Sequence, residues 1–143
     1  MLTRDTLENY EKAHQIEWAS DLPDGCPPDD ILVPEDEVFY RFTLKEDTIT
    51  EMDFKSNLEK YPNKPYRGQY HVLASGLSLL QTDEPSELWN HPGMKRNKGI
   101  VKLILGPDDG VLMKTGEDKK HYTWWRTKAF DITSATFIKD ENA

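Results

Sequence analysis

The fold is decided by the stretch Lys119-Lys120-His121-Tyr122-Thr123-Trp124-Trp125-Arg126, which holds two of the four tryptophans. Aromatic residues and threonine favour strands, so we predict a strand over residues 121–126. Successive side chains of a strand point to opposite faces. One face then carries His121, Thr123 and Trp125, and the other carries Tyr122, Trp124 and Arg126. We expect one tryptophan in the core and the other half-exposed.

This strand also carries candidate ligand-binding residues. His121, Thr123 and Trp125 offer a ring nitrogen, a hydroxyl and a stacking surface, which suit a nucleotide or another planar ligand. Arg126 adds a cation at the end of the strand. Tryptophan on a strand normally packs in the core, and that alternative stays open.

Composition indicates one soluble domain. The 143 residues are 36% hydrophobic and 31% charged, and no apolar run approaches the ~18 residues that span a bilayer. The first residues lack the apolar core of a secretory signal. Cys26 is the only cysteine, which excludes an internal disulfide and a cysteine-based zinc site. We therefore expect a cytoplasmic protein without membrane association.

The charge is distributed unevenly along the chain. Residues 1–60 carry 16 acids and 6 bases, whereas residues 61–139 carry 8 acids and 12 bases. The net charge of -8 disfavours non-specific nucleic-acid binding, although the basic second half could bind a phosphate locally. Alternatively, the two halves complement each other within the fold.

The first 37 residues differ in composition from the rest. Thr3 as an N-cap and a thin apolar stripe predict a helix over residues 3–20. Residues 21–37 contain four prolines, seven acids and no base, which predicts irregular structure. The predicted organisation is an N-terminal helical arm (1–20), an acidic Pro-rich linker (21–37) and a main domain (38–143).

The fold class predicted for the chain is α+β, with a mainly antiparallel sheet of about five to six strands and three peripheral helices. Strands are expected near residues 38–43, 71–80, 100–105, 111–115, 121–126 and 135–139. Helices are expected near residues 3–20, 51–61 and 84–91. The turn-forming stretch Gly106-Pro107-Asp108-Asp109-Gly110 predicts a hairpin between the strands that flank it.

No complete catalytic or metal-binding signature occurs in the sequence. The four histidines are far apart, so no metal is expected. Arg41 is flanked by apolar residues on its strand and should have an anionic partner, either an internal carboxylate or a ligand. His121 as a general base beside Ser75 or Ser78 also stays open.

Three stretches resemble a group of small uncharacterised bacterial proteins that carry Tyr-Arg, Gly-Leu-Ser and His-x-Thr-Trp-Trp in that order. The resemblance covers roughly residues 37–139 and implies no activity. The stretches are Phe39-Tyr40-Arg41, Ala74-Ser75-Gly76-Leu77-Ser78 and His121-Tyr122-Thr123-Trp124-Trp125.

A looser similarity is to the ADP-ribosyltransferase class. Its arginine-type members use an arginine on an early strand to contact NAD, a Ser-x-Ser on a later strand and a late catalytic glutamate. Arg41, Ser78 and Glu117 would fill these places. The chain departs from the pattern at Thr115, where those members have a second Glu or Gln two residues before the glutamate.

The function expected from these features is a small binding or accessory domain that recognises a protein partner or a small anionic ligand. Its candidate binding residues are Arg41, His121, Thr123, Trp125 and Arg126. The alternative is an NAD-using, ADP-ribosyltransferase-like enzyme.

Overall fold

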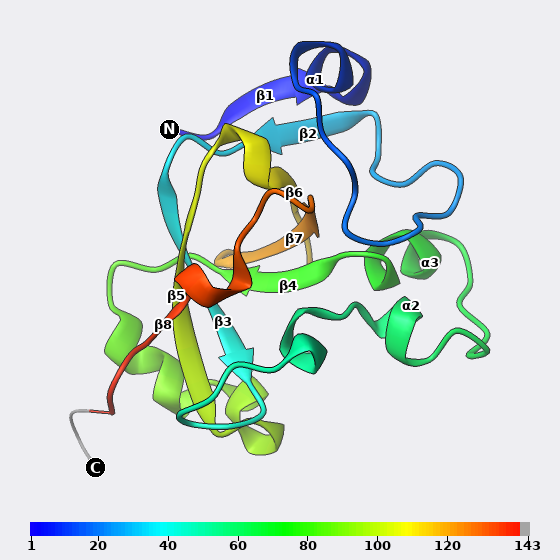
Figure 1. Ribbon diagram of the computed structural model, residues 1–143. Coiled ribbons are helices and arrows are strands. Elements are labelled where there is room, and N and C mark those ends of the chain that lie inside the picture. The colour runs from blue at the N-terminus through cyan, green and yellow to red at the C-terminus, as the bar shows by residue number, and fades with distance from the viewer. Residues whose placement is uncertain (141–143) are drawn as a thin grey trace.

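An eight-stranded antiparallel sheet curls into a half-barrel in the computed structural model, which describes residues 1–140 (Figure 1). The strands lie in the order β1-β2-β6-β7-β4-β3-β5-β8. Their bounds are β1 Thr3–Thr6, β2 Asp30–Val33, β3 Glu37–Thr43, β4 Leu77–Leu80, β5 Gly99–Leu105, β6 Gly110–Lys114, β7 His121–Arg126 and β8 Thr136–Phe137.

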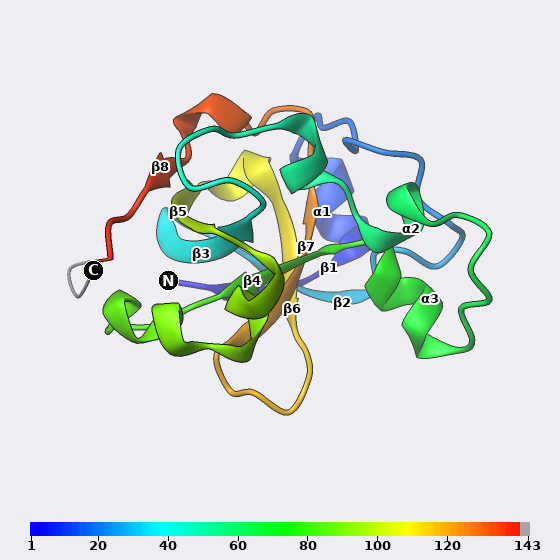
Figure 2. The same cartoon turned by 90° about the horizontal axis from the view of Figure 1, so that it is seen from below.

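Helices are short and peripheral. The α-helices are α1 Leu7–Ala13, α2 Asn57–Lys60 and α3 Gln69–Ala74. The 3₁₀ helices are η1 Glu51–Phe54, η2 Pro85–Asn90, η3 Pro92–Arg96, η4 Pro107–Asp109 and η5 Ile132–Ser134. Seen from below, α2 and α3 lie together at one side of the sheet (Figure 2).

The predicted fold of five to six strands with three helices is wrong. Within residues 1–140 the sheet has eight strands, and only α1 reaches seven residues. The two extra strands come from the segments expected to be a helix and an irregular linker. Residues Thr3–Thr6 pair with β2, and β2 pairs in turn with β6 through Leu32 and Leu112. Ile31 and Val33 of β2 are buried, which gives this short strand its place in the sheet.

Local capping explains why the predicted helices are shorter or broken. Thr6 accepts a hydrogen bond from the Asn9 amide at 3.1 Å, so the first helix begins only after β1. The helix expected over 51–61 is divided because Ser56 caps a new turn, with its hydroxyl 3.2 Å from the Glu59 amide. The strand expected over 71–80 is α3 followed by β4.

The longer apolar strands were predicted correctly. β3 and β5 pair over their full length, from Glu37↔Leu105 to Thr43↔Gly99. The hairpin expected between 100–105 and 111–115 is wrong, because β6 pairs with β7. The turn at η4 therefore carries the chain from β5 near one edge of the sheet to β6 near the other.

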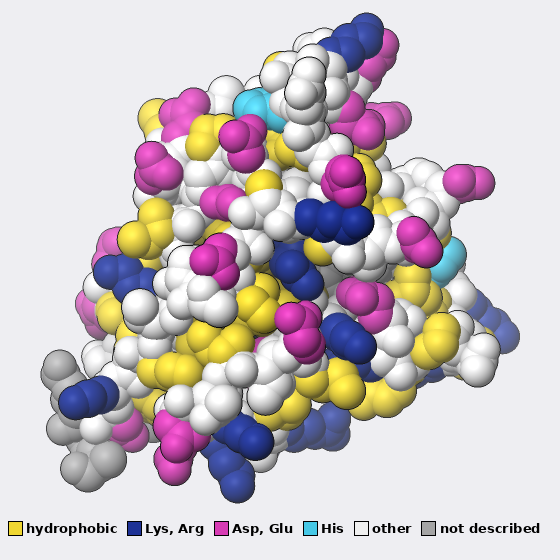
Figure 3. Space-filling model, viewed as in Figure 1, with side chains coloured by type: hydrophobic (Ala, Val, Ile, Leu, Met, Phe, Trp, Pro, Cys, Tyr) yellow, Lys and Arg dark blue, Asp and Glu magenta, His cyan; other side chains and the backbone are white. Residues whose placement is uncertain are grey.

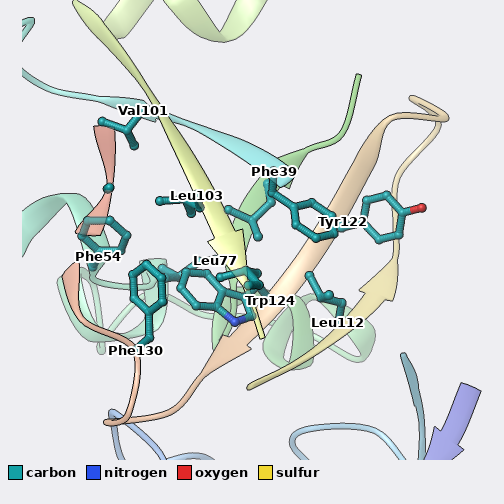
Figure 4. Close-up of a cluster of buried hydrophobic side chains, with 12 residues drawn as sticks. Phe39, Phe54, Leu77, Val101, Leu103, Leu112, Tyr122, Trp124 and Phe130 are labelled. Atoms are coloured by element: carbon teal, nitrogen blue, oxygen red, sulfur yellow. The ribbon is translucent and has the colours of Figure 1, made fainter. Parts of the chain in front are cut away.

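The central core fills the concave side of the sheet around Trp124 (Figure 4). The Trp124 ring meets Phe130 edge-on at 5.0 Å and Phe54 at 6.5 Å between centroids. Its indole nitrogen donates to the Asp109 carbonyl at 3.0 Å. The cluster comprises Phe39, Phe54, Leu77, Leu79, Val101, Leu103, Leu105, Leu112, Tyr122, Trp124, Phe130 and Ala135.

Two further clusters cover the opposite face. One packs α1 and residues 14–22 over Trp125, and the other packs η2 and η3 over Tyr40 and Ile100. The Trp125 indole donates to the Ser75 hydroxyl at 2.9 Å. The two tryptophans do lie on opposite faces, but Trp124 is 0% and Trp125 1% exposed. The half-exposed tryptophan expected from the sequence is therefore wrong.

Tyr10 anchors α1 and should give the stability a specific dependence on pH. Its hydroxyl donates to the Pro107 carbonyl at 2.7 Å, and burial raises its pKa to about 12. Since the pKa in the unfolded chain is near 10, the folded state holds this proton more tightly. The contribution is constant below about pH 10, and about 1.4 kcal/mol is lost by about pH 11. Urea denaturation at about pH 8 and pH 11 measures this loss.

Phenylalanine at position 10 provides the comparison. Tyr10→Phe should remove this part of the loss, whereas Tyr61→Phe, at a tyrosine that is 58% exposed, should behave as the parent does. Equal losses in the parent and in Tyr10→Phe would show that this phenol does not titrate differently on folding.

None of the helices within residues 1–140 is long and apolar enough to cross a membrane. In the same residues, no three His, Cys, Asp or Glu side chains are grouped so that they could hold a metal ion.

Candidate ligand-binding cavity

A cavity of about 600 Å³ lies on the face of β4 and β7 opposite the central core. We call it the β4–β7 cavity. Its floor is formed by Ser78, Thr115, His121 and Thr123. Its wall is formed by residues of the chain that leads from α2 through α3: Asn57, Lys64, Pro65, Tyr66, Arg67, Tyr70, Leu73 and Ala74.

A chain of hydrogen bonds holds the floor in place. Nδ1 of His121 lies 3.1 Å from the Thr115 carbonyl and 2.9 Å from the Thr115 hydroxyl. The Thr115 hydroxyl lies 2.8 Å from that of Thr123. Because a carbonyl can only accept, Nδ1 of the neutral His121 ring carries the proton. Nε2 is then an acceptor available to a ligand.

Strand pairing places Ser78 beside this chain of polar groups. Ser78 is directly opposite Thr123 in the β4–β7 pair, so the two side chains share a face of the sheet. Ser78 is exposed, and its hydroxyl makes no hydrogen bond within residues 1–140. The floor therefore presents one free hydroxyl and one imidazole nitrogen in a row across two strands.

The wall combines aromatic rings with cations. The Tyr66 hydroxyl lies 3.0 Å from the Asn57 carbonyl and 3.2 Å from that of Tyr61, which folds the segment back on α2. Lys64 lies 5.9 Å from the centroid of the Tyr66 ring. Tyr70 is 65% exposed and lines the cavity together with Lys64 and Arg67. Cations above an apolar, aromatic surface suit a planar anion.

Arg41 serves the fold and does not line the cavity. Its Nε donates to the Asp53 carbonyl at 2.7 Å and its Nη1 to the Ser78 carbonyl at 2.8 Å. Burial lowers the pKa of Arg41 to about 10; Asp53 opposes the shift and Arg126 adds to it. No carboxylate of residues 1–140 forms a salt bridge with it. Backbone carbonyls thus take the place of the anionic partner expected from the sequence.

The carboxylate of Asp53 is held by other groups. It accepts from the Leu44 amide at 2.9 Å and from the Thr50 amide at 2.8 Å. Arg41 and Asp53 therefore join β3, β4 and η1 through separate bonds to the backbone.

The other predicted site residues are dispersed. Trp125 is sealed under residues 14–22, and Arg126 lies over the Phe54 ring at 5.8 Å. Burial lowers the pKa of Arg126, and Glu51 and Glu59 oppose that shift. Glu117 is exposed in the turn before β7 and does not line the cavity. The structure thus brings together His121, Thr123 and Ser78, but not Arg41, Ser78 and Glu117.

The sequence analysis missed the wall residues, because it took Tyr61 only as the end of the helix expected over residues 51–61. Cations and tyrosines alternate through the stretch Lys60-Tyr61-Pro62-Asn63-Lys64-Pro65-Tyr66-Arg67-Gly68-Gln69-Tyr70. Two prolines within it exclude a regular helix, so these side chains are presented from a loop. Alternating cations and tyrosines on a proline-containing loop could therefore have indicated a binding surface from the sequence.

A hollow of similar size near the start of β3 has the opposite character. Three carboxylates and one lysine are its charged groups, and its lining comprises Val38, Gln81, Thr82, Asp83, Glu84, Glu87 and Lys120. The hydrogen bond with Glu87 raises the pKa of Glu84, and repulsion from Glu87 adds to the shift. Negative charge is already crowded there, which disfavours an anionic ligand.

A scan against protein-family models found no match for this chain, and searches of curated proteins and of solved structures found none either.

Proposed function

We propose that this protein is a binding domain for a small anion that contains a planar apolar group, held in the β4–β7 cavity. The observation that carries the proposal is the convergence of three kinds of group on one cavity of about 600 Å³. These are the cations Lys64 and Arg67, the Tyr66 and Tyr70 rings, and the polar floor around His121. Ligand sites combine apolar walls with a few fixed polar groups in this way.

Each group has a distinct task in this proposal. The rings of Tyr66 and Tyr70 and the side chain of Leu73 contact the planar part of the ligand. Lys64 and Arg67 neutralise its charge, and Arg67 can bind a phosphate or carboxylate through two parallel hydrogen bonds. The Ser78 hydroxyl and Nε2 of His121 orient the remaining polar groups.

The geometry lends no support to an NAD-using transferase built on Arg41, Ser78 and Glu117. Both hydrogen bonds of Arg41 go to backbone carbonyls, and the Glu117 side chain lies in an exposed turn outside the cavity.

Thermal unfolding with a panel of four anions tests the proposal. We expect 5′-AMP and phenyl phosphate to raise the Tm more than ribose 5-phosphate or inorganic phosphate, because only the first two have an aromatic ring. A ligand at 100 times its Kd stabilises the fold by ~2.7 kcal/mol. Lys64→Ala and Arg67→Ala should each weaken binding about tenfold or more, since hydrogen bonds to charged groups contribute ~1.5–3 kcal/mol.

A substitution that fills the cavity provides the control. Ser78→Phe places a ring on the floor and should abolish the shifts, whereas Thr136→Phe, also at an exposed strand position, should retain them. The proposal fails if no member of the panel shifts the Tm, or if Ser78→Phe binds as the parent does.

A further inference from the structure

We infer that the ligand held at this face is part of a single-stranded nucleic acid, whose chain continues from the β4–β7 cavity into a neighbouring hollow. The inference rests on the proposed function, because the first nucleotide would occupy that cavity. Three observations support it: a second hollow that shares a residue with the cavity, a local excess of cations and exposed tyrosine rings.

The second hollow has a volume of about 630 Å³ and is lined by Lys60, Tyr61, Pro62, Asn63, Lys64 and Arg96. Lys64 also lines the β4–β7 cavity, so the two hollows meet at this side chain. Arg96 comes from η3, whereas the other lining residues belong to α2 and the loop after it. A chain molecule bound in the cavity would pass Lys64 and reach Arg96.

The local charge is opposite to that of the whole protein. Residues 55–71 carry four Lys or Arg and one Glu, within a chain of net charge -8. Lys60, Lys64 and Arg96 line the same hollow, so three cations face one space. Dark blue and yellow side chains lie side by side over this part of the molecule, at the lower right of Figure 3. Phosphate groups of a bound chain would pair with these cations.

The tyrosines supply stacking surfaces. Tyr61 is 58% and Tyr70 65% exposed, and the prolines at 62 and 65 restrict the backbone between them. Lys60 lies 6.0 Å from the centroid of the Tyr61 ring, so cation and ring are presented together. Stacking of a base on an exposed ring contributes ~1–3 kcal/mol, independent of sequence.

The same observations disfavour other polyanions. A duplex hides the faces of its bases and would bring many phosphates towards the acidic surface of a protein with 16 acids in residues 1–60. An acidic peptide would use the cations but not the exposed rings. A single strand offers phosphates and unstacked bases together, and a few nucleotides need only this patch.

Fluorescence anisotropy with labelled dT12, a 12-base-pair duplex and a 12-residue poly-glutamate peptide tests the inference. We expect dT12 to bind at least tenfold more tightly than 5′-AMP, the duplex or the peptide, with affinity that falls as salt rises. The double variant Tyr61→Ala/Arg96→Ala should weaken dT12 about tenfold or more and leave 5′-AMP binding unchanged. Lys45→Ala and Ile104→Ala, at exposed positions outside both hollows, should bind dT12 as the parent does.

The outcomes separate this inference from the function on which it rests. If 5′-AMP binds but dT12 binds no tighter, or if the double variant binds dT12 normally, the inference is wrong and the cavity remains a site for small anions. Equal affinity for the peptide would also overturn it, because charge alone would then explain binding. If dT12 does not bind, the inference is wrong; if no member of the anion panel binds either, the proposed function is wrong as well.

Discussion

Replacing Trp124 by alanine is expected to lower the free energy of unfolding by about 3–5 kcal/mol, as large aromatic deletions in cores do. Trp124 is 0% exposed and lies between Phe54 and Phe130 in the central core. Truncation leaves a cavity there and removes the donor of the 3.0 Å bond to the Asp109 carbonyl. The loss is measured by urea denaturation followed by circular dichroism.

Trp89 provides a matched control for this prediction. It is half-buried under the cluster around Tyr40, and its indole nitrogen has no hydrogen-bond partner in the described part of the chain. Trp89→Ala should therefore cost less than Trp124→Ala, because less surface and no hydrogen bond are lost. A Trp124→Ala variant no less stable than Trp89→Ala would contradict the placement of Trp124 at the centre of the core.

Gly110→Ala is expected to cost about 3 kcal/mol or more, because it combines backbone strain with a clash. Gly110 has φ 125° and ψ −167°, a conformation in which residues with a side chain are rarely found. A Cβ at this position would lie 2.1 Å from the Trp125 carbonyl oxygen and 2.8 Å from Nε1 of Trp124. Since the nearest atom belongs to the backbone of the paired strand, β6 and β7 would have to separate.

Substitutions at two other glycines separate the effect of backbone strain from that of the clash. Gly25 has φ 79° and no atom within 4 Å of an added Cβ, so Gly25→Ala tests conformation alone and should cost about 1 kcal/mol. Gly76 is not restricted by φ, but its Cβ would lie 2.4 Å from Cγ2 of Thr123, so Gly76→Ala tests the clash at about 1–3 kcal/mol. The same denaturation experiment should rank Gly110→Ala as the most destabilising. A cost no greater than that of Gly25→Ala would contradict the pairing of β6 and β7 at this point.

The strands that could be predicted are those with long apolar or aromatic runs. Residues 37–43, 99–105 and 121–126 alternate or remain apolar for six or seven positions, and each forms a strand within one residue of its predicted bounds. β2 was missed because it has only four residues and lies among acids and prolines. Its place in the sheet depends on β1 and β6, which are remote in the sequence. Local patterns do not contain that information.

The lengths of the helices were overestimated because local apolar spacing was read without the contacts between distant parts of the chain. A thin stripe of apolar residues at helical spacing was taken as one helix over residues 3–20. Tyr10 does belong to the short helix α1, but Trp18 lies beyond its end and pairs with Thr127 in an antiparallel bridge. In the second predicted helix, Thr50 and Ser56 each begin a separate turn. Capping residues in close succession indicate several short helices.

The candidate site could be predicted only in part. Alternation along β7 placed His121 and Thr123 on one face, and pairing with β4 adds Ser78, which was singled out for a different reason. Trp125 shares that face but is covered by residues 14–22, a contact between distant parts of the chain. The wall of the cavity depends on how the chain from α2 through α3 packs beside β4 and β7, which no local pattern indicates.

The central claim is that the β4–β7 cavity binds a planar anion, and a ¹H–¹⁵N NMR titration with 5′-AMP tests it most directly. We expect saturable shifts of the amide signals of Ser78, His121 and Thr123 and of residues 64–70, with smaller changes elsewhere. Ser78→Phe should remove them. Saturable shifts centred on the acidic hollow around Glu84, or no saturable shifts, would contradict the claim.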